Sequence, residues 1–152
     1  MDVFYCTLED LTGAGIPEAD IITLAAEKGD KSGVLDEANF DACRRAARGV
    51  IDGFAMMRYS SMIPFSPVPE AIKTIAICLT KYQLYSRKNS ITNTLQTEYD
   101  NQISILKSIS NGTFKLFGES APVQKDSIAF TDVAPEDRKF HSSKITGYLP
   151  GE

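Results

Sequence analysis

The chain has 152 residues, of which 43% are hydrophobic and 24% are charged, and its formal net charge at pH 7 is -4. A chain of this length and composition is typical of one soluble globular domain with an ordinary core. The acidic balance argues against broad electrostatic binding to DNA or to anionic lipid, because both require a basic surface.

The cysteines and the single histidine give no sign of a metal site. Cys6, Cys43 and Cys78 lie far apart without a CxxC pair, and His141 is the only histidine. The usual spacing of a zinc site is therefore absent, and the cysteine usage indicates a reduced, cytosolic protein. The longest strongly apolar run, residues 75–79, is far too short for a membrane span, and the N-terminus does not have the pattern of a signal peptide. We expect no metal, no cofactor and no membrane association.

Two short helices are predicted first. Thr7 is a suitable N-cap for one of them, with Asp10 in its first turn. Pro17 suits the first position of the second helix, which we expect to run to about Lys28, with Gly29 as its terminator. Both helices are expected to pack against the longer helices that follow.

The loop that follows has a superficial similarity to a calcium-binding loop, with Gly33 in the place of its turn glycine. Lys28 then falls at the first liganding position and Asn39 at the position of the bidentate glutamate. Calcium needs several hard oxygen ligands, so a cation at one of those positions opposes binding. We interpret the loop as a plain turn between helices.

A long amphipathic helix is predicted after Asp36, its N-cap. Seven apolar residues recur there at steps of three and four over about five turns, which is the helical period. Gly49 and Gly53 interrupt the pattern, each costing about 1 kcal/mol relative to alanine. Two glycines four residues apart favour close approach of another helix, with a local bend as the alternative. The seven apolar residues are Phe40, Cys43, Ala47, Val50, Ile51, Phe54 and Met57.

Prolines separate this helix from the next one. Residues 60–69 are predicted to be non-helical, because proline has no backbone donor and pushes the preceding residue toward extended conformations. Glu70 opens a fourth helix that runs to about Lys88 and is apolar on most sides, which places it at the centre of a core or an assembly. A fifth helix is predicted over about 94–111, with Gly112 as its terminator.

The helical period is lost from residue 112 onward. We therefore predict an all-α fold of about five helices, with antiparallel long helices around an apolar central helix over residues 1–111. Residues 112–152 are predicted to form an extended or partly disordered arm with room for short strands, since alternation at residues 113–116 is typical of strand or extended chain. Disordered tails are usually poor in aromatic residues, so this arm is expected to pack on something.

No residue pattern indicates catalysis. The chain has neither a phosphate-binding glycine loop nor a hydrolase nucleophile motif, and adjacent residues such as His141 and Ser142 project apart in extended chain. We expect no catalytic residue and no enzymatic activity. Met56, Met57 and Met62 have two interpretations, a soft partner-binding patch or core filling at a helix end, and the second is favoured.

Arg44, Arg45 and Arg48 form the densest basic cluster and share one side of the long helix. The simpler interpretation is a solvated helix face. The alternative is contact with DNA or with a partner, which would make the protein a DNA-binding or packaging-accessory protein.

A series of short motifs runs in order through nearly the whole chain. The motifs are Thr7-Leu8-Glu9-Asp10-Leu11, Gly33-x-Leu35-Asp36, Ala46 through Ile51-Asp52-Gly53-Phe54, Arg58-Tyr59, the Pro64/Pro69 linker, Tyr82-x-Leu84-Tyr85-x-Arg87, Ile109-x-x-Gly112, and Arg138-Lys139-Phe140 through Ile145-x-Gly147-Tyr148. Together they resemble a known family, the small helical neck protein of Mu-like phages and prophages. That family is related in fold to head–tail connector (adaptor) proteins. The chain departs from its pattern at Lys28, where an acidic residue is common, and at Ile63-Pro64-Phe65, where the family tends to Leu-Pro-Leu.

The resemblance implies a virion structural protein without catalytic role or cofactor. It implies a homo-oligomeric ring, often twelvefold in connector proteins, that lies between portal and tail proteins around a channel through which DNA passes without specific contact. The implied location is the virion, and the cytoplasm of the bacterial host during assembly. A tail-completion or assembly-chaperone role is a further alternative. Four phenylalanines of the arm are the candidate subunit-interface residues: Phe114, Phe117, Phe130 and Phe140.

Overall fold

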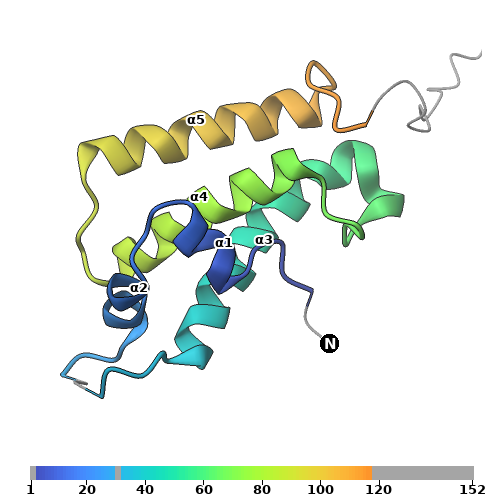
Figure 1. The fold of residues 1–152 in the computed structure, drawn as a ribbon. Helices are drawn as coiled ribbons and strands as arrows, with labels where there is room; N and C mark the ends of the chain where they lie inside the picture. Colours follow the sequence, from blue (N-terminus) through green and yellow to red (C-terminus); the bar gives the residue numbers. More distant parts are fainter. Residues whose placement is uncertain (1–2, 30–31, 118–152) are drawn as a thin grey trace, which may run out of the picture. The chain divides into compact units, whose positions relative to one another are not determined.

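The computed structural model describes residues 3–29 and 32–117, and all regular structure in these residues is helical, as predicted (Figure 1). Internal contacts divide the chain into residues 1–121 and 122–152. The second unit, with His141 and the predicted interface residues Phe130 and Phe140, lies outside the described residues. The helices are α1 (Leu8–Gly13), α2 (Glu18–Ala25), α3 (Glu37–Tyr59), the 3-10 turn η1 (Ser60–Met62), α4 (Glu70–Arg87) and α5 (Asn93–Ser110).

The helix starts follow from the capping residues in the sequence. The Asp36 side chain accepts a hydrogen bond from the Asn39 N–H at 3.0 Å and begins α3 as predicted. The predicted end of α2 is wrong, because α2 ends at Ala25 rather than near Lys28. Ala26 has extended backbone, and its carbonyl oxygen accepts a hydrogen bond from Lys88 Nζ at 2.7 Å. This bond links the end of α2 to the end of α4.

The predicted apolar central helix is confirmed as α4, which packs against each of the other four α-helices. α4 and α5 run in opposite directions, as the short connection between them requires (Figure 1). The only buried polar residue of the described core is Thr80, whose hydroxyl lies 3.3 Å from Cys6 Sγ. The buried residues of α4 are Ile72, Ile75, Ala76, Leu79, Thr80 and Leu84.

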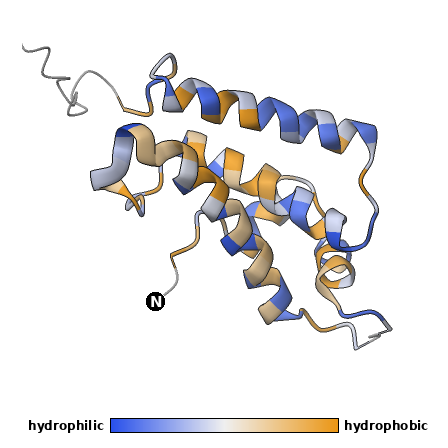
Figure 2. Cartoon of the chain, turned by 180° about the vertical axis from the view of Figure 1, so that it is seen from behind, coloured by the Kyte–Doolittle hydropathy of each residue, from blue (hydrophilic) through white to orange (hydrophobic). Residues whose placement is uncertain are grey.

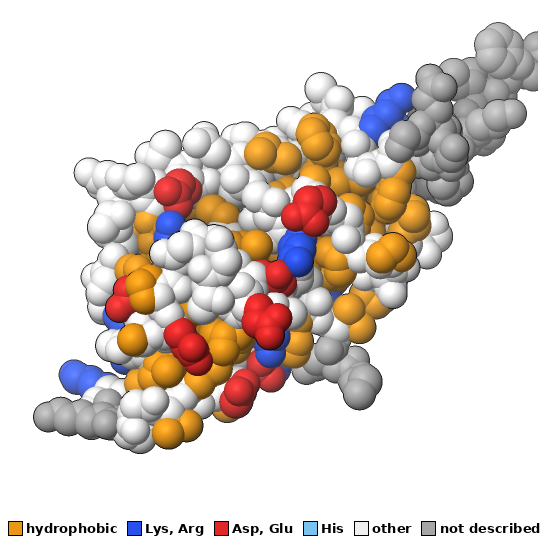
Figure 3. All heavy atoms as spheres, viewed as in Figure 1, with side chains coloured by type: hydrophobic (Ala, Val, Ile, Leu, Met, Phe, Trp, Pro, Cys, Tyr) orange, Lys and Arg blue, Asp and Glu red, His pale blue; other side chains and the backbone are white. Residues whose placement is uncertain are grey.

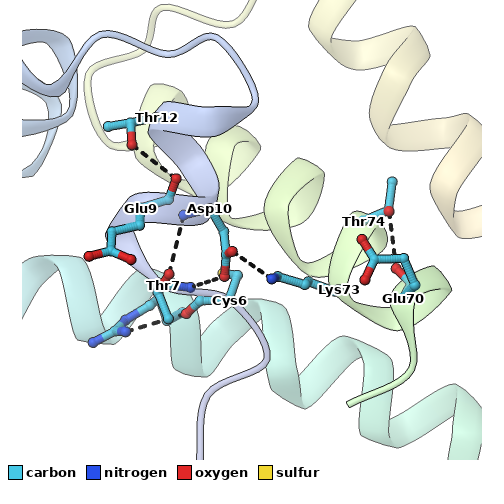
Figure 4. A network of polar contacts seen from close by, with 9 residues as sticks. Cys6, Thr7, Glu9, Asp10, Thr12, Glu70, Lys73 and Thr74 are labelled. Atoms are coloured by element: carbon cyan, nitrogen blue, oxygen red, sulfur yellow. Dashed lines mark hydrogen bonds and ion pairs between the residues drawn. The ribbon is translucent and has the colours of Figure 1, made fainter.

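A polar network fixes α1 on α4 (Figure 4). The Thr7 hydroxyl accepts from the Asp10 N–H at 3.2 Å, and Asp10 Oδ2 accepts from the Thr7 N–H at 2.8 Å, which completes a capping box. Asp10 Oδ1 also pairs with Lys73 Nζ of α4 at 2.7 Å. Burial alone would raise the pKa of Asp10, but the bonds from Lys73 and Thr7 outweigh it and lower that pKa. Asp10 therefore caps its own helix and anchors it at once.

The buried stripe of α3 differs from the predicted one at the end of the helix. Val50 and Phe54 are half-buried, and Met57 is 76% exposed. Ala55 and Tyr59 continue the stripe instead, because steps of four from residue 47 keep one face of the helix toward the core, while residue 57 projects to the other side. The buried residues of α3 are Phe40, Cys43, Ala47, Ile51, Ala55 and Tyr59.

The prediction that Gly49 and Gly53 admit a neighbouring helix is wrong within the described chain. Both glycines are exposed, and a β-carbon added to either would have no atom within 4 Å. We predict that Gly49→Ala and Gly53→Ala each stabilise the isolated protein by about 0.5–1 kcal/mol, because alanine costs less entropy in a helix. Thermal unfolding of the two variants measures this, and a lower melting temperature for either one would show that the glycine is required by the fold.

Two segments predicted from local sequence differ in the structure. Residues 60–69 were expected to be non-helical, but Ser60–Met62 continues α3 as a 3-10 turn. The prolines restrict the backbone only from Ile63, so nothing prevents one more turn before them. Residues 113–116 form bends and no strand. The arm predicted to begin at residue 112 therefore starts as irregular chain, and its Leu116 and Phe117 pack against the helical core.

Candidate interaction surface

Four segments far apart in sequence meet around a chain of aromatic rings at one end of the helical unit. Tyr5 lies in residues 3–6, which we call the strap. Its ring centroid is 5.8 Å from that of Phe65 in residues 63–69, which we call the proline loop. The Phe65 centroid is 6.3 Å from that of Tyr59, and the Tyr59 centroid is 5.9 Å from that of Phe117, both in edge-to-face geometry. We call these four rings the aromatic relay. Such contacts add to the apolar burial of the rings themselves.

Polar groups hold the first ring of the relay. Tyr5 Oη donates to Asp52 Oδ1 at 2.5 Å and accepts from the Phe65 N–H at 3.3 Å. Asp52 Oδ2 in turn pairs with Arg48 Nε at 3.0 Å. Burial, followed by the hydrogen bond to Asp52, raises the pKa of Tyr5 to about 12. The phenol therefore stays protonated near neutral pH and keeps donating to Asp52.

The last rings of the relay hold the chain that leaves α5. Tyr59 Oη accepts a hydrogen bond from the Leu116 N–H at 3.2 Å. Gly112 turns the chain after α5 with a φ of 80°, in the left-handed region that favours glycine. A β-carbon at this position would collide with the Arg58 guanidinium. The backbone of residue 112 thus lies directly against the Arg58 guanidinium, which belongs to α3.

A pocket of about 340 Å³ opens beside the relay. The proline loop forms most of its wall, and Phe117 closes one side. Its volume lies at the small end of the range of ligand pockets, which is about 300–1,000 Å³. Its lining residues are Ser61, Met62, Ile63, Pro64, Phe65, Ser66, Pro67 and Phe117.

The structure does not place the three arginines of the predicted DNA contact in one environment. Arg44 pairs with Asp41, donates to the Cys6 carbonyl at 3.4 Å, and its guanidinium lies 3.9 Å from the Phe4 ring centroid. Arg48 donates to the Val3 carbonyl at 2.9 Å in addition to its bond to Asp52. Arg45 is exposed. Two of the three side chains thus fasten the strap to α3, a role that their spacing alone does not reveal.

The solvent-facing side of α3 is poor in charged residues. Met56 and Met57 are 61% and 76% exposed, although core filling was the favoured prediction for them. That prediction is wrong for these two and right for Met62, which packs against the core. The small exposed residues that precede them on the same side continue the surface, and Figure 2 shows much of α3 in pale orange. We call it the outer face of α3, formed by Ala38, Ala42, Arg45, Ala46, Gly49, Gly53, Met56 and Met57.

Hydrophobic side chains also gather near the end of α5. Figure 3 shows orange side chains on the right of its face, around the end of α5 and the start of α4. Phe114, one of the predicted interface residues, is 42% exposed and donates its N–H to the Ser108 carbonyl at 2.9 Å. Phe117 instead packs within the relay. The predicted interface residues Phe130 and Phe140 lie outside the described residues.

Reactive groups in the described residues are dispersed or buried. No three histidine, cysteine or acidic side chains there come close enough to hold a metal ion. Burial raises the pKa of all three cysteine thiols, so they remain protonated and poorly nucleophilic near neutral pH. A second hollow of about 600 Å³ lies at the end of α2, where Lys88 and Ser90 supply polar groups. The absence of catalysis stays a prediction.

A comparison with protein families decides the identity. Residues 5–131 match the family described as bacteriophage Mu, Gp36. The chain belongs to the bacteriophage Mu Gp36 family. Comparisons with curated proteins and with solved structures found no match.

The Gp36-family match confirms the resemblance to a Mu-like phage protein that the motifs indicate. It includes the strap from Tyr5 onward, all the helices and the relay, and it extends to residue 131. The motif at residues 138–148 lies beyond it. None of the helices in the described ranges is long and apolar enough to cross a membrane.

Proposed function

We propose that this Gp36-family protein is a non-catalytic structural subunit of the virion. In this proposal it lies at the neck, between the portal and the tail, and copies of it form a closed ring around the DNA channel. It would be made in the cytoplasm of the bacterial host and join the particle during assembly. Membership of the family supports a phage protein. The observations below support the more specific proposal of a position at the neck.

The observation that carries the proposal is the outer face of α3. The exposed side of a helix on a globular protein usually bears charged and polar residues. The outer face instead consists of alanine and glycine with one charged residue, Arg45, and ends in two exposed methionines. From Ala38 to Met57 this face is about 29 Å long. A contiguous exposed apolar surface of this kind marks a site of protein–protein contact.

Ring geometry gives this surface a specific role. Subunits in a ring contact head to tail, so each subunit presents two different complementary surfaces to its neighbours. We propose that the outer face of α3 is one of them, and that the second includes exposed Phe114 and the proline-loop pocket. This contact would explain why residues 49 and 53 are glycine, since glycine lets the backbone of the neighbouring subunit approach closely.

The proposal assigns DNA no specific contact. The net charge is -4, and Arg44 and Arg48 are engaged with the strap and with acidic side chains. Binding of duplex DNA that fell steeply between low and physiological salt, and that was lost on replacement of Arg45, would favour the packaging-accessory alternative.

Deletion of the gene from an inducible prophage tests the proposal. We expect DNA-filled heads and free tails to accumulate, and we expect the purified protein to restore their joining in a lysate. Mass spectrometry of the wild-type particles should find the protein in them. Joined, infectious particles from the deletion strain would contradict a connector role, and absence of the protein from wild-type particles would indicate an assembly chaperone instead.

A further inference from the structure

The first and the last described segments of the chain are attached to the same four rings. The strap reaches the proline loop through Tyr5, by ring contact and by the Phe65 N–H bond. Residues 112–117 reach the end of α3 through Phe117 and through the Leu116 N–H bond to Tyr59. Phe65 and Tyr59 touch each other and join the two halves. No other set of described aromatic contacts links more than two segments, since Tyr82 and Tyr99 form only a pair between α4 and α5.

From this arrangement we infer that the relay couples the strap to residues 112–117, so that loosening either one loosens the other. This inference concerns the conformation of the single subunit, and it stands whether or not the protein forms a ring. Its physical basis is a contiguous series of packed side chains, which can transmit a change in order between two sites. Coupling between two sites is reciprocal.

Each step of the coupling corresponds to a contact in the structure. When the Tyr5 ring leaves, Phe65 loses a ring neighbour and its N–H loses its acceptor. Phe65 is 1% exposed and is held by Tyr5 on one side and Tyr59 on the other. A displaced Phe65 removes an edge contact from Tyr59, whose hydroxyl accepts the Leu116 N–H. The strap itself is held by Arg44 and Arg48 through backbone carbonyls.

The consequence is that a partner bound at one segment changes the other. A partner that lifts the strap from α3 would release residues 112–117, through which the chain continues beyond the described residues. A partner that orders residues 112–117 would conversely tighten the strap. Phe117 lines the proline-loop pocket, and Tyr5 contacts Phe65 in the wall of that pocket.

Hydrogen exchange on the full-length protein tests the coupling, with the Leu116 amide as reporter. Tyr5→Leu removes the hydroxyl and the ring, and Tyr5→Phe removes the hydroxyl alone. We expect Tyr5→Leu to raise exchange at Leu116 by about 2- to 30-fold, the range of coupling through such networks, and Tyr5→Phe to raise it less. Phe117→Leu should raise exchange in the strap, as reciprocity requires.

Phe4→Leu is the matched control, because Phe4 lies in the strap and stacks on Arg44 but makes no contact with Phe65 among the described ring pairs. It should remove the Phe4–Arg44 contact, keep the Tyr5–Phe65 contact and leave exchange at Leu116 unchanged. The amides of Ile75 and Leu79 in α4 report global opening. The coupling is wrong if Tyr5→Phe and Phe117→Leu leave the opposite segment unchanged, or if Phe4→Leu affects Leu116 as strongly as Tyr5→Leu does. It is also wrong if the α4 amides in Tyr5→Phe accelerate by the same factor as Leu116.

Discussion

Replacement of Met56 and Met57 by lysine is expected to abolish assembly and to leave the subunit folded. Both side chains are mostly exposed in the isolated chain, and surface substitutions usually change stability by no more than about 0.5 kcal/mol. Lysine is a good helix former and is favourable near a helix C-terminus. In a subunit interface, however, each ammonium would be desolvated without a partner. A penalty of about 4 kcal/mol at each contact weakens that contact roughly a thousandfold.

The matched control replaces the same two methionines by leucine. Leucine keeps the apolar surface and a similar volume, so this variant should assemble as the wild type does. Mass photometry and electron microscopy measure assembly with the portal, and circular dichroism confirms that both variants are folded. A lysine variant that assembles normally would remove the outer face of α3 from the interface.

Replacement of Phe65 by alanine is expected to destabilise the fold strongly. Its ring is 1% exposed and lies between Tyr5 and Tyr59. Removing a buried phenylalanine side chain costs about 3–5 kcal/mol through lost burial and the cavity left behind. A domain of this size has a total stability of about 5–15 kcal/mol, so the variant should be marginal at 37 °C.

Phe114 provides the control for this prediction, since it is 42% exposed. Phe114→Ala should change the free energy of unfolding by no more than about 1 kcal/mol, because its ring is only partly buried. Urea denaturation followed by circular dichroism measures both variants under one condition. Equal losses of unfolding free energy in the two variants would show that burial of the Phe65 ring does not stabilise the fold more than the exposed Phe114 ring does. A loss of assembly in Phe114→Ala without a loss of stability would support its predicted interface role.

The features that the sequence predicts well are those set by neighbouring residues. Asp36 and Glu70 mark the starts of α3 and α4, because capping and proline restriction act within a few residues. The central position of α4 follows from its apolar surface on most sides, which only a central helix can bury. The end of α2 differs from the prediction, because the Ala26 carbonyl accepts a hydrogen bond from a distant residue, Lys88.

The candidate site depends on contacts between distant residues, so less of it was predictable. Arg44 and Arg48 looked like one exposed basic patch, yet their partners include carbonyls about 40 residues away in the strap. Met57 fits the apolar spacing of α3 as well as Ala55 and Tyr59 do, and only the position of the core decides between them. Phe117 falls in the predicted arm because the helical period is lost from residue 112, but its ring packs against that of Tyr59.

The central claim is that this Gp36-family protein forms a ring at the phage neck through the outer face of α3. A reconstruction of the induced phage particle, at a resolution that separates helices, tests it most directly. We predict a ring of this chain between portal and tail, with Met56 and Met57 covered by a neighbouring copy. A neck without this chain, or a ring in which the outer face of α3 is open to solvent, would contradict the account.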